Sequence, residues 1–118
     1  MDLRGIMIIT KVSDVPVQQN PHHIDARPVY SSPHAVAVVI TLQPDESLKK
    51  HITPVDVFFY VIEGTGVIEI GDEKETVSQD SIVESPAGIP HRWINESDHL
   101  LRVLVIKVPK PTEMTKLL

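Results

Sequence analysis

Hydrophobic residues fall into short runs separated by glycine, proline and acidic turns, a pattern typical of all-β proteins. Two runs, Ala35–Leu42 and Asp56–Glu63, are rich in β-branched and aromatic residues and predict buried strands. Leu100–Val108 predicts a long strand that is apolar on both faces. Shorter segments predict further strands, the first two of them forming a hairpin: Val67–Ile70, Glu75–Val77, Ser81–Glu84 and Arg92–Asn95.

The two ends of the chain are less regular. We expect a strand over Ile6–Val12 and an extended stretch over Val15–Pro21. Prolines interrupt the polar segment His22–Pro33, which we interpret as a surface loop. The tail Thr112–Leu118 is the one segment that we expect to form a helical turn.

The length of the chain allows one hydrophobic core. With 118 residues, no tandem repeat and no linker-like segment, the sequence predicts a single domain over residues 1–118. Its core barrel is expected over about residues 35–108, preceded by an N-terminal strand and loop over residues 1–34.

Charge and cysteine content narrow the functional classes. The chain has 11 Lys and Arg against 16 Asp and Glu, a net charge of −5, and no basic cluster. This balance argues against nucleic acid and anionic membranes as partners, because both are bound mainly through Lys and Arg. No apolar run reaches the roughly 20 residues of a membrane span, and no signal peptide is evident. The absence of cysteine excludes disulfides, thiolate ligands and a cysteine nucleophile, and we expect a cytoplasmic protein.

Two segments carry histidine within a pattern of turn residues. The first, residues 45–64, contains His51 between Asp45 and Gly64. The second begins at Asp80 and continues with the pattern Pro-x-Gly-x-x-His-x-x-x-Asn, formed by Pro86, Gly88, His91 and Asn95. Together the two segments resemble the paired motifs of the cupin superfamily. The resemblance covers residues 45–95 closely and implies an all-β, cupin-type double-stranded β-helix, or jelly-roll barrel.

Asp45 and Asp80 stand where both cupin motifs begin with glycine. Aspartate is one of the few residues other than glycine that tolerate a left-handed backbone. We therefore expect both turns to be retained.

The resemblance also implies a metal site, with two histidines and a glutamate from the first motif and one histidine from the second. In this sequence Thr53 stands at the second histidine position and Val57 at the glutamate position. His51 and His91 remain as metal ligands for a divalent ion such as Mn, Fe, Ni, Zn or Cu. Waters, substrate or distant side chains would complete the shell. His22, His23 and His34 are further candidates for a third ligand, although adjacent histidines before a strand are usually exposed.

Strand alternation predicts which side chains line the interior. If His51 faces inward, so does Thr53, and Val57 and Phe59 share the inward phase of the next strand. Trp93 shares the phase of His91. These four residues, Thr53, Val57, Phe59 and Trp93, are predicted to line a pocket; plain core packing is the alternative for the two aromatic residues. Asp56 points outward.

Two functions from different classes remain open. One is a metal-dependent enzyme, such as an isomerase, lyase or dioxygenase, acting on a small molecule. The other is a metal-free module that binds or senses a small ligand, with His51 and His91 as neutral, hydrogen-bonded imidazoles. In either case the apolar outward residues Phe58, Tyr60 and Ile62, together with Leu100–Val108, predict a homodimer.

Overall fold

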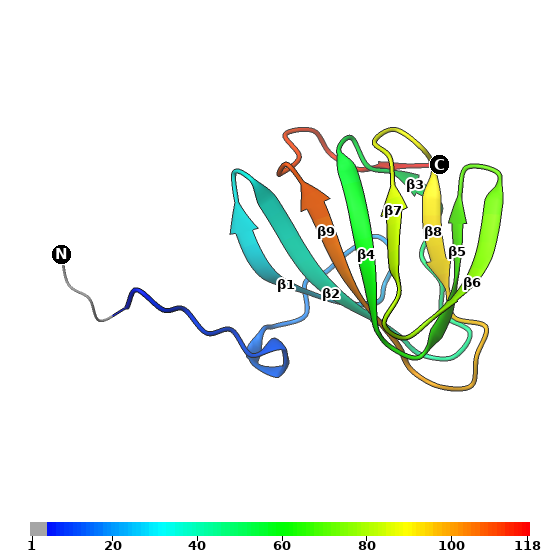
Figure 1. Cartoon of the computed structure of the whole chain (residues 1–118), viewed down its shortest axis with the longest axis horizontal. Helices are drawn as coiled ribbons and strands as arrows, with labels where there is room; N and C mark the ends of the chain where they lie inside the picture. The colour runs from blue at the N-terminus through cyan, green and yellow to red at the C-terminus, as the bar shows by residue number, and fades with distance from the viewer. Residues whose placement is uncertain (1–4) are drawn as a thin grey trace.

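The computed structural model describes residues 5–118, which form two antiparallel sheets of five strands each (Figure 1). The first sheet, in spatial order, contains β1 (Asp25–Ser32), β2 (Ala35–Leu42), β9 (Leu101–Val108), β4 (Asp56–Glu63) and β7 (Ile82–Ser85). The second contains β10 (Lys116–Leu117), β3 (His51–Ile52), β8 (His91–Ile94), β5 (Thr65–Ile70) and β6 (Glu73–Ser78).

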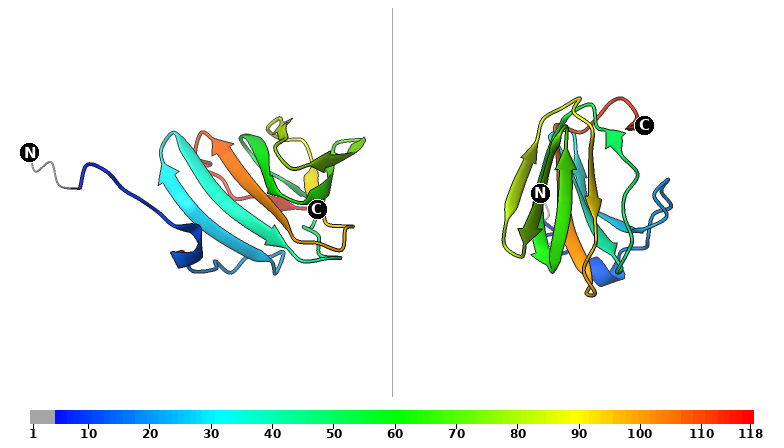
Figure 2. Two further views of the ribbon diagram at one scale, coloured as in Figure 1. Left: turned by 60° about the horizontal axis from the view of Figure 1, so that its bottom comes forward. Right: turned by 90° about the vertical axis from the view of Figure 1, so that its right-hand side faces the viewer.

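The core lies between the two sheets, which Figure 2 shows from two further directions. Burial alternates along β4, where Val57, Phe59 and Val61 are buried and the intervening side chains are more exposed. This alternation is the one predicted from the sequence, and it follows from the period of two residues in a strand. Trp93 on β8 and Leu101 on β9 are fully buried and complete the centre of the core.

The most apolar segments were predicted correctly. Ala35–Leu42 and Asp56–Glu63 coincide with β2 and β4, and the expected hairpin is formed by β5 and β6. Asp45 and Asp80 have φ values of 70° and 68°, so aspartate does occupy both left-handed turns.

The predictions for the N-terminal part were wrong in two places. Ile6–Val12 forms no strand; the side chains of Ile6 to Ile9 are exposed. The segment extends outside the two sheets and approaches them at the short 3-10 helix η1 (Val12–Asp14) (Figure 1). The expected loop His22–Pro33 contains β1 instead. Proline is tolerated there because β1 is an edge strand, with a register shift between Pro28 and Tyr30.

The C-terminal tail forms a strand rather than the expected helical turn. Lys116 and Leu117 make up β10, which pairs with β3, and Leu117 lies opposite His51. The hydrogen bonds that hold β10 come from β3, which lies far away in the sequence, so the local sequence of the tail does not predict them. Thr115, just before β10, is thereby brought to the interior.

The expected closed barrel was also wrong, because the two sheets face each other without being closed into one continuous hydrogen-bonded ladder. Within residues 5–118, no helix is long and apolar enough to cross a membrane.

Candidate functional site

Pairing of β3 with β8 brings the two motif histidines together. His51 and His91 are register partners across this ladder, and their ring centroids are 4.6 Å apart in an edge-to-face arrangement. Both residues are buried. The contact therefore comes from strand pairing between segments that are far apart in the sequence.

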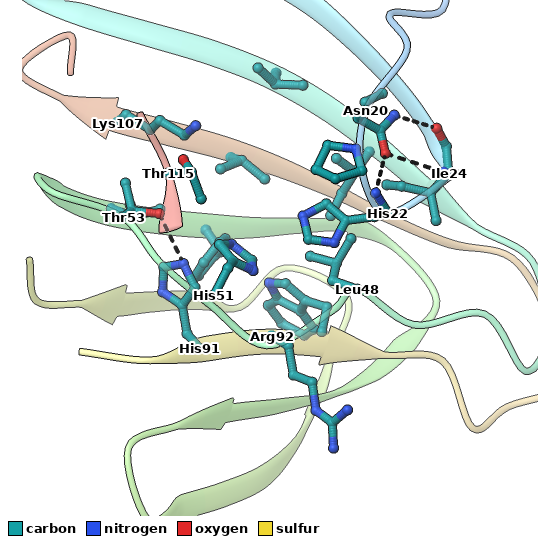
Figure 3. A pocket seen from close by; sticks show the side chains of 18 of the residues that line it. Asn20, His22, Ile24, Leu48, His51, Thr53, His91, Arg92, Lys107 and Thr115 are labelled. Atoms are coloured by element: carbon teal, nitrogen blue, oxygen red, sulfur yellow. Dashed lines mark hydrogen bonds between the residues drawn. The ribbon is translucent and has the colours of Figure 1, made fainter. Parts of the chain in front are cut away.

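A cavity of about 200 Å³ lies between the sheets at this point (Figure 3). All six residues predicted for the site contribute to its wall: His51, Thr53, Val57, Phe59, His91 and Trp93. Phe59 and Trp93 also belong to the hydrophobic core, where their rings meet edge-to-face at 5.5 Å. They thus pack the core and border the cavity at the same time.

His22, one of the three additional histidines considered from the sequence, lies on the wall beside His51, with ring centroids 4.9 Å apart. The Asn20 side chain stabilises the loop that carries His22. It accepts hydrogen bonds from the backbone N–H groups of His22 and Ile24 and donates one to the Ile24 carbonyl. His23 and His34 are exposed, as expected for loop residues.

The backbone of Lys49 determines which nitrogen of each neighbouring imidazole carries hydrogen. Its N–H lies 2.8 Å from His22 Nδ1 and can only donate, so neutral His22 is protonated on Nε2. Its carbonyl lies 2.7 Å from Nδ1 of His51 and can only accept, so neutral His51 carries its hydrogen on Nδ1 and keeps a lone pair on Nε2. Adjacent rings therefore present a donor and an acceptor.

Burial keeps these histidines neutral at pH 7. It lowers the pKa of His22 to about 4, with the positive charges of His51, Lys49 and Lys107 adding to the effect. The pKa of His91 is also lowered to about 4, by burial first and then by His51 and Lys107. Burial lowers the pKa of His51, although its hydrogen bond to the Lys49 carbonyl acts in the opposite direction.

Two hydroxyl groups hold the His91 ring. Ser85 Oγ lies 2.7 Å from Nδ1, and Thr53 Oγ1 lies 3.2 Å from Nε2. Ser85 is buried at the end of β7, so it is more than the turn residue that its position before Pro86 indicates. Thr53, at the family's second histidine position, occupies the ring nitrogen that would otherwise be open to a ligand.

Lys107 is a residue that the sequence analysis missed. It lies on β9, and its side chain extends from the wall toward the cavity (Figure 3). Burial lowers its pKa, and its charge in turn depresses the pKa of all three cavity histidines. Alternation along β9 contains the signal, because Val103, Val105 and Lys107 share the inward phase.

No Asp or Glu belongs to the cavity wall within residues 5–118. Arg92 borders the cavity, but its guanidinium turns away and binds Glu69, with Nε 2.9 Å from Oε2 (Figure 3). Asp56 points outward as predicted, where it accepts a hydrogen bond from the Ala87 N–H. The cavity is therefore basic and apolar, with no acidic group from the part of the chain that the structure describes.

Asn95, the last residue of the second motif, has a structural role. It is fully buried, donates from Nδ2 to the carbonyls of Leu42 and His99, and accepts from the backbone and hydroxyl of Ser97. These bonds secure the turn after β8 against the end of β2. Of the motif residues, His91 thus lines the cavity and Asn95 stabilises the turn after β8.

The donor set does not fit a protein-held divalent metal. Such sites usually offer three or four nitrogen, sulfur or carboxylate ligands. Within residues 5–118 no group of three or more His, Cys, Asp or Glu is arranged to hold an ion. His51 keeps a lone pair on Nε2, but His91 Nε2 is hydrogen-bonded to Thr53 and His22 presents N–H rather than a lone pair.

Residues 38–107 match the model of the protein family described as Cupin domain, and the family assignment rests on this match. This chain is a cupin. The matched segment runs from β2 to β9 and includes both histidine motifs. A search of curated proteins finds no match.

Solved structures support the same fold. TT1209 from Thermus thermophilus is 28% identical, with a TM-score of 0.76 over 89% of this cupin and 100% of that chain. The polyketide cyclase RemF from Streptomyces resistomycificus is 19% identical, with a TM-score of 0.82 over 96% of this cupin and 86% of that chain. A predicted oxalate decarboxylase from Thermotoga maritima is 14% identical, with a TM-score of 0.76 over 94% of this cupin and 100% of that chain. The double-stranded β-helix predicted from the sequence is confirmed.

Proposed function

We propose that this cupin binds a small organic molecule in the cavity between its sheets, without a resident metal. The observation that carries the proposal is a mostly apolar cavity of about 200 Å³ with a few polar groups directed into it. Small-molecule sites have this composition, because apolar walls supply affinity and the polar groups fix orientation. A ligand the size of benzene is suited to the space, since an apolar cavity of about 150 Å³ is known to bind it.

The arrangement of polar groups favours binding over metal chemistry. His22 offers an N–H and His51 a lone pair, and the backbone of Lys49 holds both rings in these states. Two adjacent groups of opposite hydrogen-bonding character suit an organic ligand. They do not suit a metal ion, which needs converging lone pairs.

Thermal unfolding of untagged, EDTA-dialysed protein tests the proposal. A panel of organic acids, amides, sugars and alcohols is added, and at least one class is expected to raise Tm progressively with concentration. Thr115→Trp, which places a large side chain on the cavity wall, is expected to abolish the shift. Thr112→Trp, on the exposed part of the same tail, is the matched control. If no compound stabilises the metal-free protein, the proposal is wrong.

Metal binding by His51 and His91 is the competing function, and one observation favours it. The two rings are adjacent, and the Nε2 lone pair of His51 is not engaged by the described part of the protein. Elemental analysis of untagged protein distinguishes the two. Stoichiometric Mn, Fe, Ni, Zn or Cu that is lost in His91→Ala would support a metal-dependent enzyme, whereas our proposal predicts substoichiometric metal in both proteins.

We also propose that the protein is a homodimer formed through the outer face of the first sheet. On this face Phe58 lies opposite Ile106, and Tyr60 lies opposite Leu104, which gives a continuous half-buried apolar stripe. Light scattering is expected to give twice the 13.2 kDa chain mass. Ile106→Lys is expected to give monomers, whereas Tyr30→Lys, on edge strand β1, is not.

For its cellular setting we propose the cytoplasm, with no nucleic-acid or membrane partner. The lack of cysteine and the net charge of −5 support this assignment. Fractionation of cells that express the protein, followed by binding assays with duplex DNA and anionic vesicles, checks each part.

A further inference from the structure

We propose that the ligand of this cavity is a small monocarboxylic acid with an apolar body, and that Lys107 binds its carboxylate. The inference rests on the proposed function and specifies the chemical class of the ligand. It depends on three features of the cavity wall formed by residues 5–118: a cation with no acidic partner, a lack of acidic side chains, and an apolar remainder.

The first feature is the charge of Lys107. None of the ion pairs formed within residues 5–118 involves this lysine. It is half-buried, and its strand neighbours are Val36 on β2 and Val57 on β4. A charged group in such surroundings is costly unless it has a counterion. The lowered pKa of Lys107 reflects the same cost.

The second feature is the polarity of the surrounding groups. Burial holds the three cavity histidines neutral, so they contribute no positive charge of their own. On the described wall the ammonium of Lys107 supplies that charge, since Arg92 is bound to Glu69. His22 supplies a second hydrogen-bond donor, its Nε2–H, besides the ammonium of Lys107. A carboxylate accepts from several donors at once, and charge-assisted bonds are roughly twice as strong as neutral ones. A cationic ligand would meet Lys107 with no carboxylate on the described wall to offset the repulsion.

The third feature is the size and character of the remaining wall. Opposite the histidines lie Val38 and Ile40 on β2, Val105 on β9 and Phe59 on β4. This surface matches an aromatic ring or a short alkyl chain. The volume of about 200 Å³ leaves room for such a body with one carboxylate. A dianion would need a second cation, and Arg92 is already bound to Glu69.

Isothermal titration of EDTA-dialysed protein tests the inference with matched probes. Benzoate and hexanoate are compared with benzamide and hexanamide, which keep the body but lack the charge, and with acetate, which keeps the charge but lacks the body. We expect each larger acid to bind at least 10-fold more tightly than its amide and more tightly than acetate. In Lys107→Met the acids are expected to lose at least 10-fold in affinity while the amides are unchanged. Lys110→Met, on the exposed tail, should behave like the wild type.

The outcomes separate this inference from the proposed function. If the amides bind as tightly as the acids, or if Lys107→Met retains the acid affinity, the carboxylate assignment is wrong. If sugars, alcohols or amides bind and acids do not, the assignment is wrong and the cavity remains a binding site. If no compound binds, both proposals are wrong. The comparison of acid with amide on the wild type gives an answer even if Lys107→Met does not fold.

Discussion

Acid should destabilise this protein through its buried cavity histidines, of which His91 is the least exposed. Burial lowers the pKa of His91 from 6.5 to about 4, with the positive charges of His51 and Lys107 acting in the same direction. In the unfolded chain the imidazole takes up a proton near pH 6.5, whereas in the folded protein it stays neutral until about pH 4. The unfolded state therefore binds more protons between these values, and the free energy of unfolding falls as the pH falls through this window.

The size of the effect follows from the two pKa values. One pH unit corresponds to about 1.36 kcal/mol per proton, so the interval from 6.5 to about 4 gives a loss of about 3 kcal/mol. Little discount for solvent screening applies, because only 3% of His91 is exposed. This loss is a large fraction of the roughly 5–15 kcal/mol that stabilises a typical domain.

Urea unfolding at half-unit steps from pH 7 to pH 4, at fixed protein concentration, measures the loss. The wild type is compared with His91→Gln, which is less stable at pH 7 but lacks the titrating group. The variant is expected to lose about 3 kcal/mol less over the window. His99→Gln removes an exposed histidine and should keep the wild-type slope. Equal slopes for the wild type and His91→Gln would refute the argument that burial holds this imidazole neutral.

Further predictions concern the turns and the two positions, Thr53 and Val57, at which the family resemblance implies metal ligands. The double variant Thr53→His with Val57→Glu restores the family's ligand set and should raise zinc or manganese affinity at least 100-fold by calorimetry; a folded variant that binds no metal contradicts this. Gly64→Ala should cost about 3 kcal/mol or more in urea unfolding, because φ is +86° and its Cβ would lie 2.2 Å from a backbone carbonyl oxygen. Gly88→Ala should cost only the left-handed strain of about 1–2 kcal/mol, because its Cβ would meet no atom within 4 Å; equal costs would refute the steric account. Asp45→Gly should stabilise the protein by up to about 1 kcal/mol, since φ is 70°, and a decrease in urea midpoint would show that the aspartate side chain matters instead.

Sequence patterns predicted strand bounds and inward-facing residues correctly where the residues of a single strand and their burial determine the structure. β2 and β4 were predicted to the residue because their β-branched and aromatic content leaves little alternative. The inward phase of Val57 and Phe59 followed from alternation alone. The same rule, extended along β9, would have assigned Lys107 to the interior.

Features that depend on distant partners were not predictable in this way. β1 is polar and contains Pro28, so only its position at the sheet edge explains why it is a strand. β10 exists because it pairs with β3. His22 reaches the cavity through a hydrogen bond with Lys49, a contact between residues that are 27 positions apart. No local pattern around His22 contains that information.

Crystallography of untagged, EDTA-dialysed protein soaked with benzoate tests the central claim most directly. Our account predicts electron density for an aromatic acid within the cavity, with its carboxylate within hydrogen-bonding distance of Lys107 Nζ. Anomalous data recorded at the metal absorption edges should show no peak. A peak within about 2.0–2.1 Å of Nε2 of both His51 and His91, with no organic density beside Lys107, would contradict the account.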